Sequence, residues 1–233
     1  MRDLLEKIYL SFLEERDGKR VVQVPFCGNR GSELLSYLLE GGEVEMHFGR
    51  NSGRVVFESK IPGLWATWQS GELKCLEVGE LPTLLLEVQG DLPLIPSFNL
   101  GELSTTRPGL MNGPYILVEI SRIAREHDFT PHPRVIPLNF LPLSLADQKL
   151  LDEKLGHGEL TICIKGYGQC WIKNTPYRNI WWVEHLNVEG KSIFKSIEIT
   201  SIPSLIRTAR EDMERGLSKI EKLMEKLDHE IPI

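Results

Sequence analysis

A pattern of residues in the first half of this chain returns in the second half, and this repeat limits the folds that the chain can adopt. The segment from Glu33 to Pro82 is matched by the segment from Lys149 to Pro203. Two copies are too few for a solenoid, which needs about three repeats to bury its faces. The repeat therefore predicts a duplicated domain with pseudo-twofold symmetry. The anchoring pairs, each 116 positions apart, are Leu34 and Leu150, Gly42 and Gly158, and Trp65 and Trp181.

Beyond the tryptophans the match continues at a wider spacing. Leu76–Leu85 aligns with Ile197–Ile206 at a distance of 121 positions, so the second copy has a longer turn near residues 186–191. Each copy is predicted to form a short helix followed by four strands. The strands are predicted because apolar and polar residues alternate along these segments. The alternating residues are Val44, Met46 and Phe48 in the first copy, and Leu160, Ile162 and Ile164 in the second.

The rest of the chain supplies further helices and connections. Alternation predicts a strand over Arg20–Phe26, whereas Gly90–Gly113 and Phe129–Pro142 are punctuated by glycine or proline and predict loop or extended structure. Pro82–Gln89 is predicted as a helix because its counterpart, Ser204–Arg210, opens a helix and proline suits a first helical turn. The other predicted helices are Asp3–Glu15, Ser32–Leu39 with Ser32 as its N-cap, and Pro114–His127.

The carboxyl-terminal helix has the most regular apolar stripe in the chain. Such a stripe needs a surface to cover it, either the sheets of this chain or another protein. Its residues, at spacings of three and four, are Leu205, Ala209, Met213, Leu217, Ile220, Met224 and Leu227.

Together these patterns predict an α+β protein made of two related units, each a helix plus an antiparallel β-sheet, with an inserted helix between them and a long carboxyl-terminal helix. The predicted segments are an N-terminal helix and strand over 1–31, a first repeat over 32–90, a linker and inserted helix over 91–146, and a second repeat with the long helix over 147–233.

Composition and charge exclude several classes of protein. The net charge is −6 and the isoelectric point is about 5.6, so a broad cationic surface for nucleic acid is not expected. The amino terminus lacks the apolar core of a signal peptide, and no apolar stretch approaches the roughly 20 residues that span a bilayer. We therefore expect a cytoplasmic protein with free thiols. The cysteines are Cys27, Cys75, Cys163 and Cys170, none in a C-x-x-C pair.

No catalytic or metal-binding constellation is predicted. His127, Asp128 and His132 lie close together in a proline-containing segment, but a stable site needs more ligands, so surface histidines are the expected alternative. Glu43 and Glu159, like Glu77 and Glu198, occupy matched positions in the two copies, which favours shared structural roles over an acid and a base in different environments. We expect no cofactor, no metal and no enzymatic activity.

The cysteines of the second copy flank a glycine-rich turn, Gly166-Tyr167-Gly168. This turn lacks the sequence of a phosphate-binding loop and predicts a β-hairpin in which glycine supplies a positive φ angle. Cys163 is expected to be buried on a strand. For Cys170, burial and an accessible, reactive thiol remain alternatives.

The chain has five tryptophans. Trp65 and Trp181 occupy matched positions and are expected in the core. Trp182 lies one residue further along its strand, so it points to the opposite side. It is either an exposed anchor for a partner, near Tyr167 and Tyr177, or a residue buried under the carboxyl-terminal helix.

The second copy resembles a known family. Its Gly166–Cys170 turn, its Asn179–Val183 strand and its Glu198–Pro203 segment, followed by the acidic pair Glu211-Asp212, are similar to motifs of the HupH/HyaF hydrogenase expression and formation proteins. The match covers roughly the final hundred residues. The chain differs from that family in its amino-terminal segment, where Asp3–Glu15 replaces a leader rich in proline and methionine.

This resemblance implies an accessory chaperone for maturation of uptake [NiFe]-hydrogenase that has no catalytic activity. The implied partners are the precursor of the iron–sulfur small subunit and other maturation proteins. The competing hypothesis is a protein that handles a metal or an iron–sulfur cluster through Cys170. The candidate partner-binding residues are Gly166, Tyr167, Gly168, Cys170, Tyr177 and Trp182.

Overall fold

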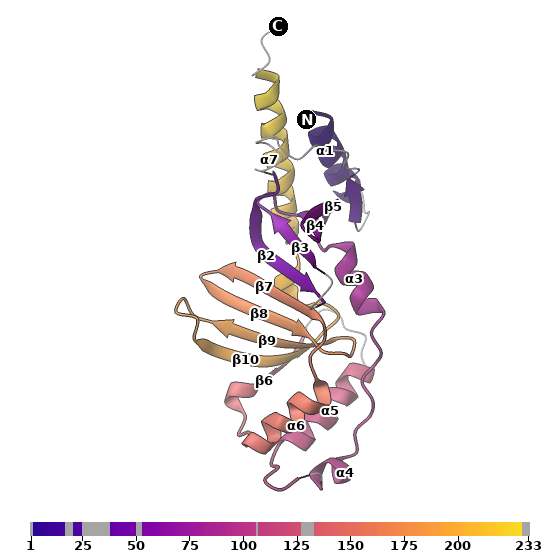
Figure 1. Ribbon diagram of the computed structural model, residues 1–233, viewed down its shortest axis with the longest axis vertical. Helices are drawn as coiled ribbons and strands as arrows, with labels where there is room; N and C mark the ends of the chain where they lie inside the picture. The colour runs from indigo at the N-terminus through magenta and orange to yellow at the C-terminus, as the bar shows by residue number, and fades with distance from the viewer. Residues whose placement is uncertain are drawn as a thin grey trace. The chain divides into compact units, whose positions relative to one another are not determined.

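The computed structural model describes residues 2–16, 21–24, 38–49, 53–105, 107–126 and 133–229. The chain divides into two compact units, whose elements are labelled in Figure 1. Unit 1 comprises Met1–Leu86 and Leu205–Ile233, and unit 2 is Glu87–Ser204. The α+β class is confirmed, because each unit combines helices with an antiparallel sheet.

Among the described residues, unit 1 has five strands in the order β1-β5-β4-β3-β2, all antiparallel to their neighbours. These strands are β1 (Val21–Val24), β2 (Gly41–Phe48), β3 (Arg54–Ser59), β4 (Leu64–Gln69) and β5 (Glu72–Gly79). The helices are α1 (Arg2–Arg16) and α7 (Arg210–His229), while α3 (Thr83–Gly90) leads into unit 2 and the 3-10 turn η2 (Ser204–Ile206) leads back.

The described part of unit 2 also has five antiparallel strands, in the order β6-β10-β9-β8-β7. They are β6 (Arg134–Pro137), β7 (Leu160–Gly166), β8 (Gly168–Asn174), β9 (Ile180–Leu186) and β10 (Ser192–Ile199). The helices are α4 (Leu100–Ser104), α5 (Gly113–Glu126), the 3-10 turn η1 (Leu138–Phe140) and α6 (Leu145–Leu155). The strand order is therefore the same in both units, with the first strand paired to the last.

A buried tryptophan makes the same contact in each unit. The indole Nε1–H of Trp65 on β4 donates to the carbonyl of Gly79 at 2.8 Å, and that of Trp181 on β9 donates to Thr200 at 3.0 Å. Both indoles are fully buried. Gly79 and Thr200 lie 121 positions apart, which is the spacing of the sequence match in that region.

The turn that precedes each of these strands is also built alike. The hydroxyl of Ser59 accepts from the backbone N–H two residues further on at 3.0 Å, and that of Thr175 does the same at 3.1 Å. Gly63 and Asn179 then adopt positive φ angles of 80° and 68°. A duplication would leave such matched contacts, although the duplication itself stays a prediction from the sequence.

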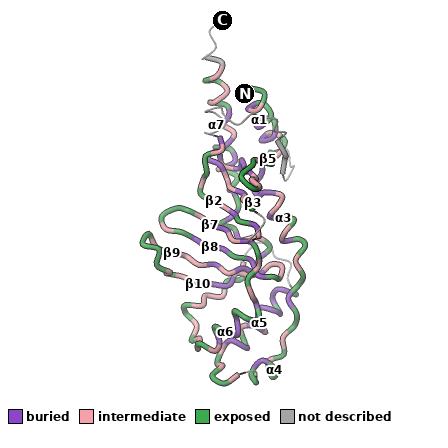
Figure 2. Tube along the Cα trace, in the orientation of Figure 1, coloured by how far each residue is buried: buried purple, intermediate pink, exposed green. Residues whose placement is uncertain are grey.

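The apolar stripe of α7 is covered within unit 1, so the partner that the sequence left open lies in the same chain. The stripe packs in a buried cluster with α1 and with the sheet, and the burial of these elements can be followed in Figure 2. The α7 members of the cluster are Met213, Leu217, Ile220, Met224 and Leu227, and the α1 members include Leu5, Ile8 and Phe12.

The prediction that this helix opens at Ser204 is wrong, because α7 begins at Arg210. Hydrogen bonds to the sheet explain the delay. The backbone N–H of Thr208 donates to the carbonyl of Glu80 at 3.1 Å, and its hydroxyl donates to Glu58 at 2.6 Å. These bonds hold the chain outside a helical conformation until Arg210.

The other predicted elements have mixed outcomes. The helices over Asp3–Glu15, Pro82–Gln89 and Pro114–His127 are confirmed as α1, α3 and α5. The predicted strand over Arg20–Phe26 is described only at Val21–Val24, where it is β1, and most of the predicted Ser32–Leu39 helix lies outside the described residues. Two irregular segments contain regular structure that the sequence did not predict, namely α4 within Gly90–Gly113, and β6 and η1 within Phe129–Pro142.

The predicted segments 1–31, 32–90, 91–146 and 147–233 follow the repeat along the chain, whereas the two units follow contacts in space. For this reason α7, placed with the second repeat by sequence, groups with unit 1. Sequence position and spatial grouping thus differ mainly for this helix and for the inserted helix α5, which packs in unit 2.

One buried carboxylate joins the two main helices of unit 2. Asp147 Oδ1 accepts from the backbone N–H groups of Met111 at 2.8 Å and Gly113 at 2.9 Å, and Oδ2 accepts from Ser144 at 2.9 Å and Asn112 at 3.3 Å. Burial alone would raise the pKa of Asp147, but these four bonds hold it below its usual value. The carboxylate therefore fixes the first turn of α6 against the start of α5.

We predict that Asp147→Asn lowers the free energy of unfolding by about 3 kcal/mol at neutral pH, because charged hydrogen bonds to buried backbone groups are lost. Since folding depresses the pKa, this stabilisation is complete above the unfolded pKa of about 3.9 and disappears as the pH falls through the folded value. The difference between the two proteins in urea unfolding should therefore shrink in acid. Asp152→Asn, on the exposed side of the same helix, is the control and should change stability by under about 0.5 kcal/mol.

A second prediction concerns Gly216 in the middle of α7. Helix propensity favours alanine over glycine by about 1 kcal/mol. However, a Cβ atom at Gly216 would lie 2.2 Å from the carbonyl oxygen of Pro62 and 3.1 Å from the ring of Phe12. Gly216→Ala should therefore destabilise the protein by about 2 kcal/mol in urea unfolding, whereas Glu214→Ala on the exposed side should be nearly neutral. A more stable Gly216→Ala protein would contradict this close approach.

Candidate functional site

The six candidate residues occupy four separate places in unit 2. Gly166, Tyr167 and Gly168 form the tip of the β7–β8 hairpin, where the Tyr167 side chain is fully exposed. Tyr177 is half-buried in the turn before β9, at the other end of β8. Cys170 and Trp182 lie on opposite faces of the sheet, because Cys170 pairs with His185 and side chains alternate along β9. Their role in binding stays a prediction.

The hairpin predicted at Gly166–Gly168 is confirmed. Gly168 has a φ angle of 105°, and a Cβ atom there would lie 2.4 Å from the carbonyl oxygen of Leu186 on the neighbouring strand. Both the conformation and the close approach require glycine. The glycine of this motif therefore has a structural role in the turn.

Cys170 is buried, so burial, and not an accessible thiol, is the correct one of the two alternatives that the sequence left open. Its side chain is 7% exposed, and burial, with a smaller contribution from the charge of Glu198, raises the pKa of the thiol to about 12. The thiol is protonated near neutral pH, whereas metal ligation and nucleophilic attack need the thiolate. Cys163 is also buried, as predicted. These positions disfavour cluster binding through Cys170.

The part of the chain that the structure describes contains no group of three His, Cys, Asp or Glu side chains that could hold a metal ion. Cys27, His127 and His132 lie outside the described residues. Of the matched carboxylates, Glu77 caps α3 by accepting from the backbone N–H of Thr83 at 3.1 Å, as a structural role predicts. No described helix has the length and apolar composition needed to cross a bilayer.

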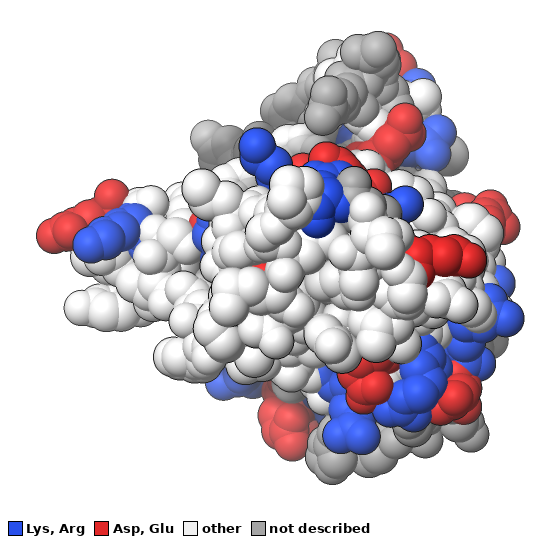
Figure 3. Space-filling model, turned by 90° about the horizontal axis from the view of Figure 1, so that it is seen from below, with Lys and Arg blue, Asp and Glu red and all other residues white. Residues whose placement is uncertain are grey.

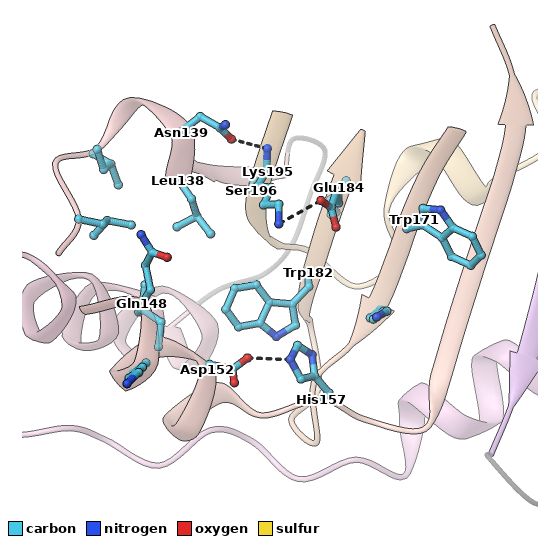
Figure 4. A pocket seen from close by; sticks show the side chains of 16 residues that line it. Leu138, Asn139, Gln148, Asp152, His157, Trp171, Trp182, Glu184, Lys195 and Ser196 are labelled. Atoms are coloured by element: carbon cyan, nitrogen blue, oxygen red, sulfur yellow. Dashed lines mark hydrogen bonds and ion pairs between the residues drawn. The ribbon is translucent and has the colours of Figure 1, made fainter. Parts of the chain in front are cut away.

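A groove of about 700 Å³ lies on the face of the unit 2 sheet that carries Trp182 (Figure 4). Strands β8, β9 and β10 supply its floor, α6 supplies one wall, and the segment around η1 supplies another. The volume is within the 300 to 1,000 Å³ typical of ligand pockets. Its apolar lining consists of Leu138, Leu141, Leu143, Leu151, Trp171, Trp182 and Val183.

Trp182 is half-buried and is held in place at the end of α6. Its indole Nε1–H donates to the carbonyl of Gly156 at 2.8 Å, and its ring lies 5.5 Å from the ring of His157. Gly156 ends the helix with a φ angle of 62°, which suits glycine. Trp182 is therefore partly covered, but by α6 and not by the carboxyl-terminal helix, and part of it remains in the groove.

The walls are fastened to the floor by polar contacts. The side-chain carbonyl of Asn139 in η1 accepts from the backbone N–H of Lys195 on β10. On the helical side, His157 Nε2 lies 2.7 Å from a carboxylate oxygen of Asp152 (Figure 4). Asp152 and His157 both belong to the helical wall, which is tied to the floor by the hydrogen bond from Trp182 to Gly156, as the η1 wall is by Asn139.

Charged side chains line the groove beside the indoles. They comprise three lysines, Lys149, Lys173 and Lys195, and two carboxylates, Asp152 and Glu184. Glu184 Oε1 lies 3.0 Å from Lys195 Nζ. Burial would raise the pKa of Glu184, but its hydrogen bonds and the charges of Lys195 and Lys173 hold it below its usual range. Glu184 is thus ionised near neutral pH.

A second surface of unit 2 is uncharged. Figure 3, which views the end that carries α4, α5 and α6, shows uncharged side chains across the middle of this face and charged ones mainly at its margins. The exposed large apolar residues of α5, α6 and their flanking segments are Leu94, Met111, Tyr115, Phe140 and Leu145.

The sequence did not predict the groove. Its floor had a usable signal, since Trp171 and Lys173 alternate with buried residues on β8, and the pairing of Lys173 with Trp182 places them on one face. The helical wall had another, because Gln148, Lys149 and Asp152 lie within one turn of α6. The wall around η1 had none, since that segment was predicted only as extended.

Comparison with known proteins gives consistent matches. Residues 110–227 match the family described as the HupH hydrogenase expression protein, C-terminal conserved region. The chain is 30% identical to hydrogenase expression/formation protein HupQ of Azotobacter chroococcum, over 97% of this chain and 81% of that protein. It is also 30% identical to HupH of Rhodobacter capsulatus, over 82% of this chain and 68% of that protein. Hydrogenase-1 operon protein HyaF of Escherichia coli is 28% identical, over 85% and 70% of the two chains.

We predict that Cys170 is unreactive in the folded protein. With a pKa of about 12, its thiolate fraction near neutral pH is on the order of a thousandfold below that of a free cysteine. Iodoacetamide should therefore alkylate Cys170 very slowly in the native protein and at the ordinary rate in denaturant, as followed by mass spectrometry of the peptide that contains it. Rapid native alkylation near pH 7 would restore the hypothesis of an accessible, functional thiol.

Proposed function

This chain belongs to the HupH family of hydrogenase expression/formation proteins, and we propose that it is a non-catalytic accessory protein that binds a hydrogenase polypeptide during maturation. Its client is the precursor of the iron–sulfur small subunit of a [NiFe]-hydrogenase, and it acts in the cytoplasm. The client rests on the motif resemblance of the second copy.

The observation that carries this proposal is the open, preformed groove of unit 2. It lies wholly within the residues that match the family, and it combines two tryptophans and four leucines with flexible lysines. Tryptophan side chains are prominent among residues that dominate binding energy at protein interfaces. A groove of this composition suits capture of a polypeptide segment better than chemistry on a small substrate.

A catalytic role for the groove has little support from its polar residues. Asp152 and His157 form a pair that could orient a general base. However, the ring of His157 packs beside Trp182, and among the described residues no serine, threonine or cysteine side chain hydrogen-bonds to it. A nucleophile and base in contact are what acyl-transfer chemistry needs.

We predict that Trp171→Ala weakens capture of the small-subunit precursor by about 2 kcal/mol, or roughly thirtyfold in Kd, because an indole of the groove is removed. The measurement is binding of purified full-length protein to each immobilised hydrogenase subunit, with circular dichroism to verify the fold. Trp171 is preferred to Trp182, whose hydrogen bond to Gly156 makes it partly structural.

Two further variants locate the binding surface. Leu10→Ala, an exposed apolar position on α1 in unit 1, is the control and should bind normally. Tyr167→Ala tests the hairpin tip. If it abolishes capture while Trp171→Ala does not, the binding surface is the tip and not the groove. Capture of neither subunit, with hydrogenase activity unchanged in a strain that lacks this protein, would exclude the proposed function.

A further inference from the structure

The lysines of the groove are not fully neutralised by acidic groups of the same chain. Lys149 lies on α6 beside Glu153, but the Glu153 carboxylate is already engaged by both terminal nitrogens of Arg107, with one contact at 3.1 Å. The guanidinium of Arg107 forms the fork that suits a carboxylate, so it satisfies that acid. Lys149 acts on Glu153 only through its charge, and no carboxylate of the described residues forms an ion pair with its ammonium, which lines the groove.

The floor of the groove has the same imbalance. Glu184 is the carboxylate of the floor, and its direct contact is Lys195 at 3.0 Å. Lys173 lies on the other side of Glu184 and acts on it only through its charge. Lys173 is also the direct cross-strand neighbour of Trp182. Among the described residues, the Lys173 ammonium therefore lies beside an indole and has no paired carboxylate.

This local excess of positive charge contrasts with the chain as a whole. The chain carries a net charge of −6, so a cationic groove does not follow from composition. The excess is small, since Asp152 and Glu184 also line the groove. A polyanion such as nucleic acid, which needs many cations along its backbone, would be repelled by these carboxylates. A ligand with a few negative charges and apolar groups fits better.

We propose that the groove binds an extended acidic segment of the partner protein, in which carboxylate side chains alternate with large apolar ones. In an extended chain, neighbouring side chains point to opposite sides and repeat every two residues. Side chains on one side of the segment can then reach Lys149 on the α6 wall, while those on the other side lie on the floor against Trp171 and Trp182, where Lys173 flanks the indoles. This inference rests on the proposed function, because it specifies which part of the client is bound.

The test uses the full chain and fluorescence anisotropy of short labelled peptides with blocked termini. The probe alternates glutamate with phenylalanine and leucine. Matched probes replace each glutamate by glutamine or by lysine. Exposed ion pairs contribute modestly, so we expect the glutamate probe to bind about tenfold more tightly than the glutamine probe and its affinity to fall with added salt. Equal binding of all three probes would overturn the inference.

Charge reversal in the protein supplies the decisive control. Lys149→Glu combined with Lys173→Glu should reverse the preference, so that the lysine probe binds more tightly than the glutamate probe. Lys154→Glu combined with Lys191→Glu makes the same change in net charge at exposed positions that do not line the groove, and it should keep the original preference. If both double variants behave alike, the effect is general electrostatics and the inference fails.

Two further outcomes separate the competing ligands. Binding that requires a free terminal carboxylate, or tighter binding of a short oligonucleotide than of the glutamate probe, would also overturn the acidic-segment proposal. The peptide result is independent of client capture. If the peptide preference is lost but Trp171-dependent capture of the client remains, only this inference is excluded. If the peptide preference remains but neither hydrogenase subunit is captured, the proposed function is excluded.

Discussion

The groove of unit 2 depends on one buried carboxylate. Asp147 satisfies backbone N–H groups at the start of α5 and, with Ser144, forms the capping box that opens α6. An unpaired N–H in this position would cost about 1 to 3 kcal/mol and an unpaired charge about 3 to 5 kcal/mol, so the two helices start at fixed points relative to each other. The point where α6 begins sets the positions of Lys149 and of the Gly156 carbonyl, which accepts the hydrogen bond from Trp182.

The two units share the same strand order but differ in the side chains on one face of the sheet. In unit 1, Phe57, Ala66 and Trp68 occupy this face and belong to the apolar cluster with α1 and α7. The matched positions in unit 2 are Lys173, Trp182 and Glu184. Apolar residues allow a helix to seal the face, whereas ions would lose hydration if covered without partners. In unit 2, Trp182 still packs against the apolar cluster of α5 and α6, whereas Lys173 and Glu184 beside it line the groove.

Much of the fold was predictable because it rests on local patterns. Alternation indicated the strands, and spacing indicated α1 and α5. The match between copies indicated α3 against the apparent strand preference of its residues, although the counterpart it relied on contains only the 3-10 turn η2 before α7 begins at Arg210. The start of α7 was not predictable, since Thr208 is kept out of the helix by Glu58 and Glu80, which are distant in sequence. Likewise, α4 is too short to leave a periodic signal.

The site was predictable only in part, for a related reason. The sequence identified the second copy and Trp182, and it left burial of Cys170 open, but it also directed attention to the hairpin tip because the Gly166–Gly168 motif is conspicuous. Glycine is required at position 168 because of the positive φ angle and because a Cβ atom would collide with the Leu186 carbonyl. This motif is therefore explained by backbone geometry. The groove instead depends on which side chains of three strands and one helix share a face. That information lies in the strand register, where Lys173 meets Trp182, and a register is fixed by the whole sheet and not by any one segment.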